Sequence, residues 1–148
     1  MLQILRRWLG AKRPQPGLIV NGIAQVCAQV QFQGVGRPNC DATVLRTADG
    51  FVWGGFVWNC SSHDRFLKLY ELGREPLASD APSMTIYVPP KSCIPLAGWV
   101  FGQNGVSNAG GVGFDHGISY RITGGPAWND ATPAAAWEVQ GALWLGGL

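Results

Sequence analysis

The segment from Ile23 to Gln33 alternates strictly between apolar and polar residues, and this alternation restricts the fold more than any other feature of the chain. A period of two residues is typical of a β-strand that buries one face. Cys27 and four glutamines would share the polar face, which leaves that thiol facing solvent or an interface. The buried face would carry Ala24, Val26, Ala28, Val30 and Phe32.

Shorter runs of this kind recur along the chain, and turn residues separate them. The run from Phe51 to Trp58 is apolar on both faces and has Gly54 and Gly55 at its centre. Glycines there predict a bulge or a close approach of two backbones. The further predicted strands cover residues 43–47, 51–58, 65–71, 83–88, 94–101, 118–122 and 136–145, and a glycine-rich loop is predicted at 102–113.

The composition agrees with a fold made of strands. Charged residues make up 14% of the chain, and only six residues are Lys or Glu, which is too few for long solvated helices. Gly and Pro, at 21 and 10 residues, supply the turns. We therefore expect an all-β protein with a single jelly-roll-like β-sandwich of about eight strands in residues 21–148.

Residues 1–20 differ in character and form a predicted N-terminal arm. Apolar residues recur there at helical spacing with basic residues between and after them, and two prolines follow. The basic residues interrupt the apolar run, so the pattern is not that of a secretory signal. A frayed tail and a segment that docks on a partner both fit the pattern. The candidate contact residues are Leu2, Leu5, Arg6, Arg7, Trp8, Leu9, Lys12 and Arg13.

The charge is unevenly placed. The net charge is +2, but four of the eleven cations precede residue 14, so seven cations face nine acids in the rest of the chain. A mildly acidic body argues against a specific nucleic-acid surface. No apolar run approaches the length of a membrane span, so no membrane partner is expected.

The cysteines do not predict a metal centre or a cofactor. Cys27, Cys40, Cys60 and Cys93 form no CxxC pair, and neither histidine stands at a zinc-finger spacing from them. Without a secretory signal, free thiols are the expected state. We expect no metal and no cofactor.

Two acid–histidine neighbours are the candidates for catalysis. His63–Asp64 and Asp115–His116 could orient an imidazole for general-base chemistry. Adjacent residues on a strand point to opposite faces, however, so chance placement on the surface explains both pairs. No nucleophile elbow, zinc-protease motif, phosphate loop or dinucleotide fingerprint is present in the sequence. We therefore expect a protein that is not an enzyme.

Seven tryptophans in 148 residues are the remaining unusual feature. Exposed indoles on a β-sandwich can anchor a protein interface or stack on sugars. Trp128, in a predicted loop, and Trp144, on the polar face of the last strand, are the candidate interface residues. The core is predicted to hold Trp53, Trp58, Trp99 and Trp137.

Four segments in this order resemble a family of small virion proteins of tailed bacteriophages: Arg65–Tyr70 (RFLKLY), Ser79–Pro89 (SDAPSMTIYVP), Phe114–Gly125 (FDHGISYRITGG) and Asp130–Thr132 (DAT). The likeness covers about residues 51–145. The arm and the stretch 102–113 depart from the family pattern, which leaves the mode of attachment open.

The resemblance implies a structural component of the virion. It implies a capsid decoration (cement) protein that binds the major capsid protein and stabilises the head shell after assembly in the host cytoplasm. A homo-oligomer is implied, with a trimer preferred by analogy. A tail or neck component and a carbohydrate-binding module are the alternatives.

Overall fold

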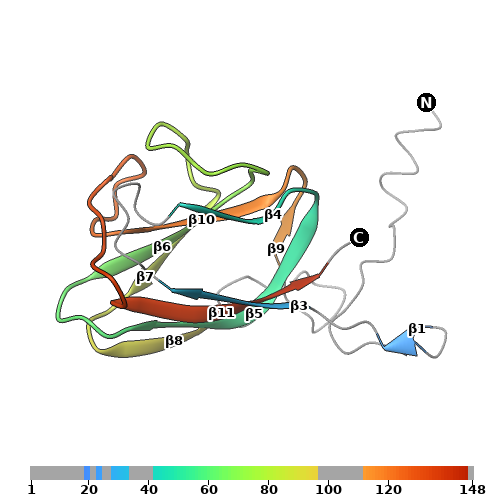
Figure 1. Ribbon diagram of the computed structural model, residues 1–148, viewed down its shortest axis with the longest axis horizontal. Helices are drawn as coiled ribbons and strands as arrows, with labels where there is room; N and C mark the ends of the chain where they lie inside the picture. The colour runs from blue at the N-terminus through green and yellow to red at the C-terminus, as the bar shows by residue number, and fades with distance from the viewer. Residues whose placement is uncertain (1–18, 21–22, 25–27, 34–41, 97–111, 147–148) are drawn as a thin grey trace.

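The computed structural model describes residues 19–20, 23–24, 28–33, 42–96 and 112–146, and every regular element in these ranges is a β-strand (Figure 1). The expected all-β class is therefore confirmed. The strands are β1 Ile19–Val20, β2 Ile23–Ala24, β3 Ala28–Gln33, β4 Thr43–Arg46, β5 Gly50–Asn59, β6 Arg65–Tyr70, β7 Met84–Val88, β8 Ser92–Leu96, β9 Val112–Phe114, β10 Ile118–Thr123 and β11 Val139–Gly146.

Two antiparallel sheets lie face to face (Figure 1). One has the order β4-β10-β6-β7, the other has the order β3-β11-β5-β8, and β9 pairs with β5. Apart from β9 and the β1–β2 hairpin, the strands pair as β3 with β11, β4 with β10, β5 with β8, and β6 with β7. A long hairpin rolled over itself pairs its strands in this nested way, so the sandwich is a jelly roll, as predicted.

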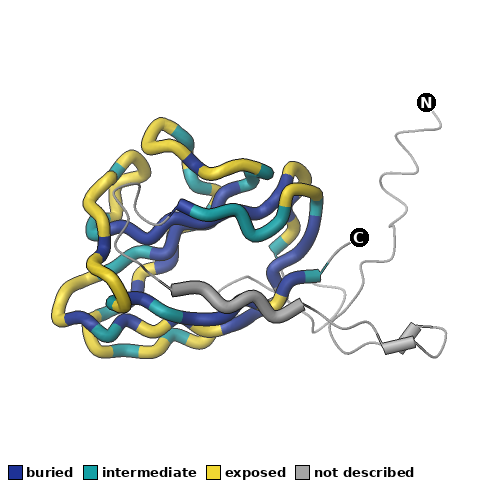
Figure 2. Tube along the Cα trace, viewed as in Figure 1, coloured by how far each residue is buried: buried dark blue, intermediate teal, exposed yellow. Residues whose placement is uncertain are grey.

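The core fills the space between the sheets. Each strand contributes alternate residues to it, as the period of two requires. Figure 2 shows the buried residues along the strands of both sheets and the exposed residues mainly in the connections. The largest fully buried side chains of this core are Leu67, Leu69, Leu96, Ile118, Ile122 and Leu143.

The two glycines at the centre of β5 confirm the predicted irregularity. On β11, Trp144 pairs with Gly54 and the next residue, Leu145, pairs with Val52, so the register skips Trp53. Gly55 has φ +145°, and a Cβ at Gly55 would lie 2.0 Å from the Ala142 carbonyl oxygen. Only glycine fits such a close approach.

The predicted strands at 23–33, 94–101 and 136–145 need correction. The first is divided between β2, which pairs with β1, and β3, which pairs with β11 in another sheet. β8 begins earlier, at Ser92, and β11 begins only at Val139. Trp137 lies before β11 with φ 66°, a left-handed conformation that stops the extended chain there. The short strand β9 was not predicted from the sequence.

The outer faces of the two sheets differ. Lys68 and Arg121 are direct register partners on the outward side of β6 and β10, yet Lys68 has no exposed surface and Arg121 is 2% exposed. The connections 71–83 and 124–133 cover them, and the Lys68 ammonium donates to the carbonyl oxygen of Ala127. The centre of the four-stranded sheet is thus covered on both sides (Figures 1 and 2), whereas Thr85 and Tyr87 on the outer side of the edge strand β7 are exposed.

Several predictions made from the sequence lie outside the described residues. They concern the arm residues 1–18, the thiols of Cys27 and Cys40, Trp99, and most of the stretch 97–111.

Candidate functional site

The five-stranded sheet exposes aromatic side chains on its outer side. Phe56 and Trp58 of β5 are 41% and 48% exposed, and Trp144 of β11 is 44% exposed. Their neighbours along each strand, among them Val57 and Leu143, point inward and are fully buried. We call this surface the aromatic face, and it comprises Gly54, Phe56, Trp58, Cys93, Pro95, Gln140, Ala142 and Trp144.

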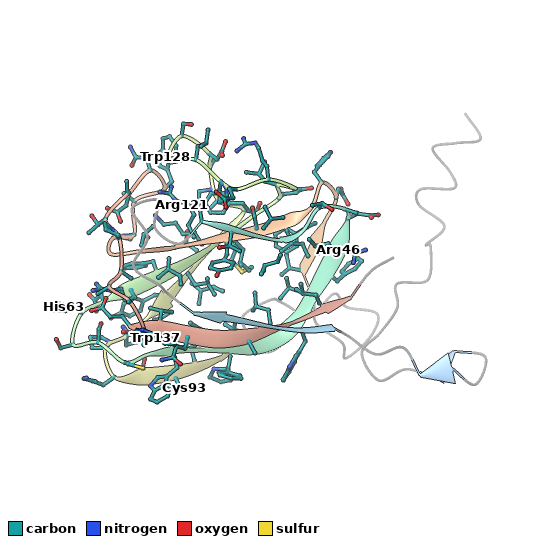
Figure 3. All side chains as sticks on the ribbon, viewed as in Figure 1. Arg46, His63, Cys93, Arg121, Trp128 and Trp137 are labelled. Carbon is teal, nitrogen blue, oxygen red and sulfur yellow. The ribbon has the colours of Figure 1, made fainter. Side chains whose placement is uncertain are left out.

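The strand register brings these residues together. Trp58 lies between Gln140 of β11 and Cys93 of β8, and Phe56 lies opposite Pro95. None of the described residues of this face carries a charge. Figure 3 shows Cys93 on the side of the sheet that is turned away from the other sheet.

A glycine sets the position of Trp144. Trp144 is the register partner of Gly54, and a Cβ at Gly54 would lie 2.9 Å from the Trp144 ring and 2.7 Å from the Leu96 carbonyl oxygen. The indole therefore packs against the glycine, in space that a side chain at this position would fill, and this contact covers part of its surface.

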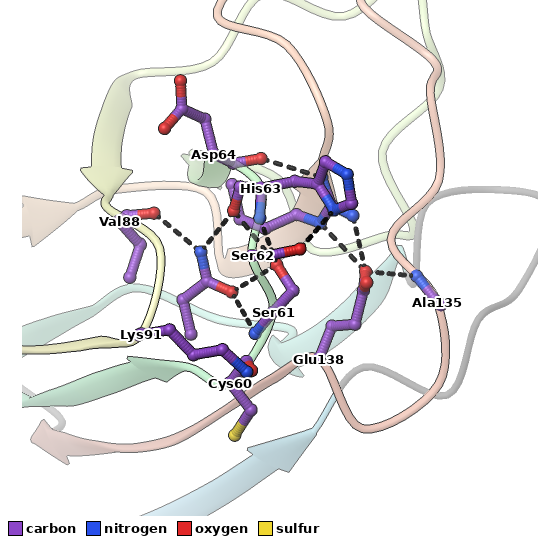
Figure 4. Close-up of polar contacts among 11 residues, drawn as sticks. Cys60, Ser61, Ser62, His63, Asp64, Val88, Lys91, Ala135 and Glu138 are labelled. Carbon is purple, nitrogen blue, oxygen red and sulfur yellow. Dashed lines mark hydrogen bonds and ion pairs between the residues drawn. The ribbon is translucent and has the colours of Figure 1, made fainter.

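At the last residue of β5, the buried side-chain amide of Asn59 holds the loop 60–64 in place (Figure 4). The Asn59 side chain has no exposed surface and donates to the carbonyl oxygens of His63 and Val88 at 2.8 and 3.0 Å. Its own oxygen accepts from the Ser61 amide and hydroxyl. Both the NH₂ group and the oxygen of this amide are used, so Asn59 supports the conformation of the loop.

An ion pair at the same end joins the two sheets. Arg65 of β6 donates twice to one carboxylate oxygen of Glu138, at 3.0 and 2.7 Å, and the Ala135 amide donates to the same oxygen at 2.7 Å. Burial raises the pKa of Glu138, but the hydrogen bonds from Arg65 and Ala135 outweigh it and hold this pKa below its ordinary value.

The division of the tryptophans into buried and exposed side chains differs from the prediction. Trp128, at 53% exposed, and Trp144 have the exposure expected of interface residues. The assignment of Trp58 and Trp137 to the core was wrong, because they are 48% and 58% exposed. The run Phe51–Trp58 is apolar on both faces, so its pattern does not indicate which side faces outward. The side chain of Trp53 lies outside what the structure describes.

The acid–histidine neighbours do not form catalytic pairs within themselves. His116 contacts Glu71 at 3.1 Å rather than Asp115, and its side chain is 80% exposed. Asp64 accepts a hydrogen bond from the Tyr87 hydroxyl at 2.9 Å, which raises the pKa of Tyr87. The two histidines lie in separate loops on the surface.

Cys60 and Cys93 are free thiols, as expected for these two positions. Within the described ranges, no three His, Cys, Asp or Glu side chains come close enough together to hold a metal ion. The same part of the chain contains no helix with the length and apolar character of a membrane span.

The aromatic face is the candidate functional surface of this sandwich. No family model, curated protein or solved structure matches the chain. The function must therefore be argued from the face and from the sequence.

Proposed function

We propose that this chain is a structural protein of a tailed-bacteriophage virion, and specifically a decoration protein that binds the head shell and stabilises it. The observation that carries the proposal is the aromatic face. A stable sandwich that leaves Phe56, Trp58 and Trp144 half exposed without any charge among them is built to be covered by another protein.

The sequence supplies the rest of the argument. The segments that resemble small virion proteins lie in the sandwich, and three of them contribute to β6, β7 and β10. The basic and apolar arm precedes the sandwich and has the composition of a docking segment. Arms and faces of many copies add their contacts on an assembled shell through effective concentration, which requires no catalytic group.

The test is binding of the purified protein to phage heads that lack it. We expect the full chain to bind, and deletion of residues 1–16 to weaken binding by about tenfold or more without changing the melting temperature. Unchanged affinity after the deletion would assign attachment to the sandwich. Failure of the full chain to bind heads, together with binding to tails or necks, would move the protein to those parts of the virion.

A carbohydrate-binding module is a second candidate, because exposed Trp and Phe rings on a sheet can stack on sugars. Sugar hydroxyls also need polar partners, and Gln140 is the one amide among the described side chains of the aromatic face. Quenching of tryptophan fluorescence by oligosaccharides, lost in a Trp58→Ala or Trp144→Ala variant, would favour this candidate.

A further inference from the structure

We propose that Asn59 accepts an N-linked glycan only while the chain is unfolded, and that a glycan on Asn59 and the native sandwich exclude each other. Asn59, Cys60 and Ser61 form the Asn-x-Ser pattern of a glycosylation acceptor, which belongs in a surface loop. In this protein the acceptor asparagine ends β5 and has no exposed surface. The inference does not depend on the proposed function, because it concerns the folding of the chain and not its partner.

Glycosylation would change the hydrogen-bonding capacity of the Asn59 amide. A bond forms between the side-chain nitrogen and C1 of the first sugar, the bond from C1 to the pyrophosphate of a lipid-linked oligosaccharide breaks, and the nitrogen loses one proton. The amide then keeps a single N–H of its original two. In the folded chain this nitrogen donates to the carbonyl oxygens of His63 and Val88 at 2.8 and 3.0 Å, so one of these bonds must be lost.

The burial of Asn59 makes the glycan incompatible with the fold. Val88 also has no exposed surface, and a buried carbonyl oxygen that loses its donor destabilises the native state. The glycan is bulky and strongly hydrated. A side chain without exposed surface offers it no path to solvent, so the end of β5 would have to separate from its neighbours.

The hydroxyl of the acceptor pattern is also held inside the protein. The Ser61 hydroxyl donates to the Asn59 side-chain oxygen at 2.8 Å and accepts from the His63 amide at 3.1 Å. Ser61 itself is only 8% exposed. Both side chains that define the acceptor are therefore engaged in internal hydrogen bonds, and an enzyme can reach them only after the loop 60–64 opens.

The contacts that close this site come later in the chain. Val88 ends β7, and the Cys60 amide donates to the carbonyl oxygen of Glu138, directly before β11, at 2.7 Å. Asn59 cannot be enclosed until these residues have been made. An oligosaccharyl transferase that acts on the nascent chain therefore meets an open acceptor, and its product is a chain that cannot complete the sandwich.

The first experiment offers the folded, purified full chain to an oligosaccharyl transferase with a lipid-linked oligosaccharide. The Ala131→Thr variant adds a second acceptor at Asn129, which is exposed in the loop 124–133, so one molecule carries both sites. Peptide mass spectrometry should find Asn59 modified at least about tenfold less than Asn129. Equal urea midpoints of the variant and the wild type would show that the variant folds. Equal modification of the two asparagines would overturn the proposal.

The second experiment translates the same variant, behind a secretory signal, into microsomes that contain the transferase. We expect nascent chains to be modified at Asn59 as well as at Asn129. Chains with a glycan on Asn59 should be digested by a protease that spares chains modified only at Asn129. Nascent chains that stay unmodified at Asn59, or Asn59-modified chains that resist the protease like the others, would each contradict the proposal.

Discussion

Trp137 combines an unfavourable backbone conformation with a side chain that stays largely exposed. Its backbone is in the left-handed region at φ 66°, and 58% of its surface is exposed. A bulky residue in that conformation costs roughly 1–2 kcal/mol relative to an ordinary backbone, and burial of the indole does not compensate for it. The same chain places Gly117 at another positive-φ position, where no such cost arises.

Replacing Trp137 by Gly should therefore raise the free energy of unfolding by about 0.5–1 kcal/mol, after the greater freedom of glycine in the unfolded chain is subtracted. Urea denaturation measures this change. Trp128→Gly is the matched control, because Trp128 is exposed without a positive φ, and it should be neutral or destabilising. Destabilisation by Trp137→Gly would show that the indole makes packing contacts that outweigh the backbone cost.

Gly55 is the position where a single methyl group should matter most. A Cβ there would lie 2.0 Å from a backbone oxygen of β11, and backbone cannot move aside as a side chain can. We expect Gly55→Ala to lower the free energy of unfolding by about 3 kcal/mol or more. In Gly125→Ala the Cβ would meet only the Asp130 carboxylate at 3.1 Å, so a much smaller loss in urea denaturation is the expected comparison.

Among the elements, the start of β11 is tied to β6 of the opposite sheet by Glu138 and Arg65. Their side chains are 20% and 12% exposed, so this pair is partly desolvated. The Arg74–Asp80 pair in the loop 71–83 offers a contrast, because the Arg74 side chain is 54% exposed, although the Asp80 side chain is 20% exposed like that of Glu138. The hydrogen bonds from Arg74 lower the pKa of Asp80 to about 2, but solvent around the Arg74 guanidinium screens this pair and reduces its contribution to stability. Burial decides how much each pair contributes to stability.

We expect Glu138→Gln to lower the free energy of unfolding by about 1–3 kcal/mol and Asp80→Asn to change it by about 0–1 kcal/mol. The pKa of Glu138 is lowered on folding, so its contribution is present above pH 4.5 and is lost as the pH falls through the folded pKa. Melting curves between pH 7 and pH 3 should show a smaller acid loss in Glu138→Gln than in the wild type. Parallel curves would exclude the ion pair as a source of acid sensitivity.

The alternation of the sequence was sufficient to predict most strands, because an extended chain with one buried face must repeat every two residues. The alternation did not predict features that depend on strand length or on tertiary contacts. β9 has three residues around Gly113, too short to show a period. Lys68 and Arg121 mark a solvent face by their charge, yet the connections 71–83 and 124–133 cover them, and Lys68 reaches Ala127, 59 residues away in sequence. The aromatic face was missed at Trp58 because both sides of β5 are apolar.

At the scale of the whole molecule, the sandwich holds together without a described metal or disulfide. Cys60 and Cys93 are free, and the metal-ligand types do not cluster in the described ranges. We expect a chelator and, separately, a reductant to leave the melting temperature nearly unchanged. A drop corresponding to about 3 kcal/mol or more in either experiment would reveal a structural metal or cross-link.

The nested pairing of β3 with β11 also sets the timing of folding. The strand at residues 28–33 has its sheet partner at residues 139–146, so the ribosome must release residues 139–146 before that sheet can close. Contacts this distant in sequence make folding slow, in the range of milliseconds to seconds for small β-proteins, and stopped-flow refolding monitored by tryptophan fluorescence would measure it. Until β11 is made, the edge of β5 that it pairs with has no partner strand, and an unpaired edge of this kind makes a partly folded chain prone to aggregation.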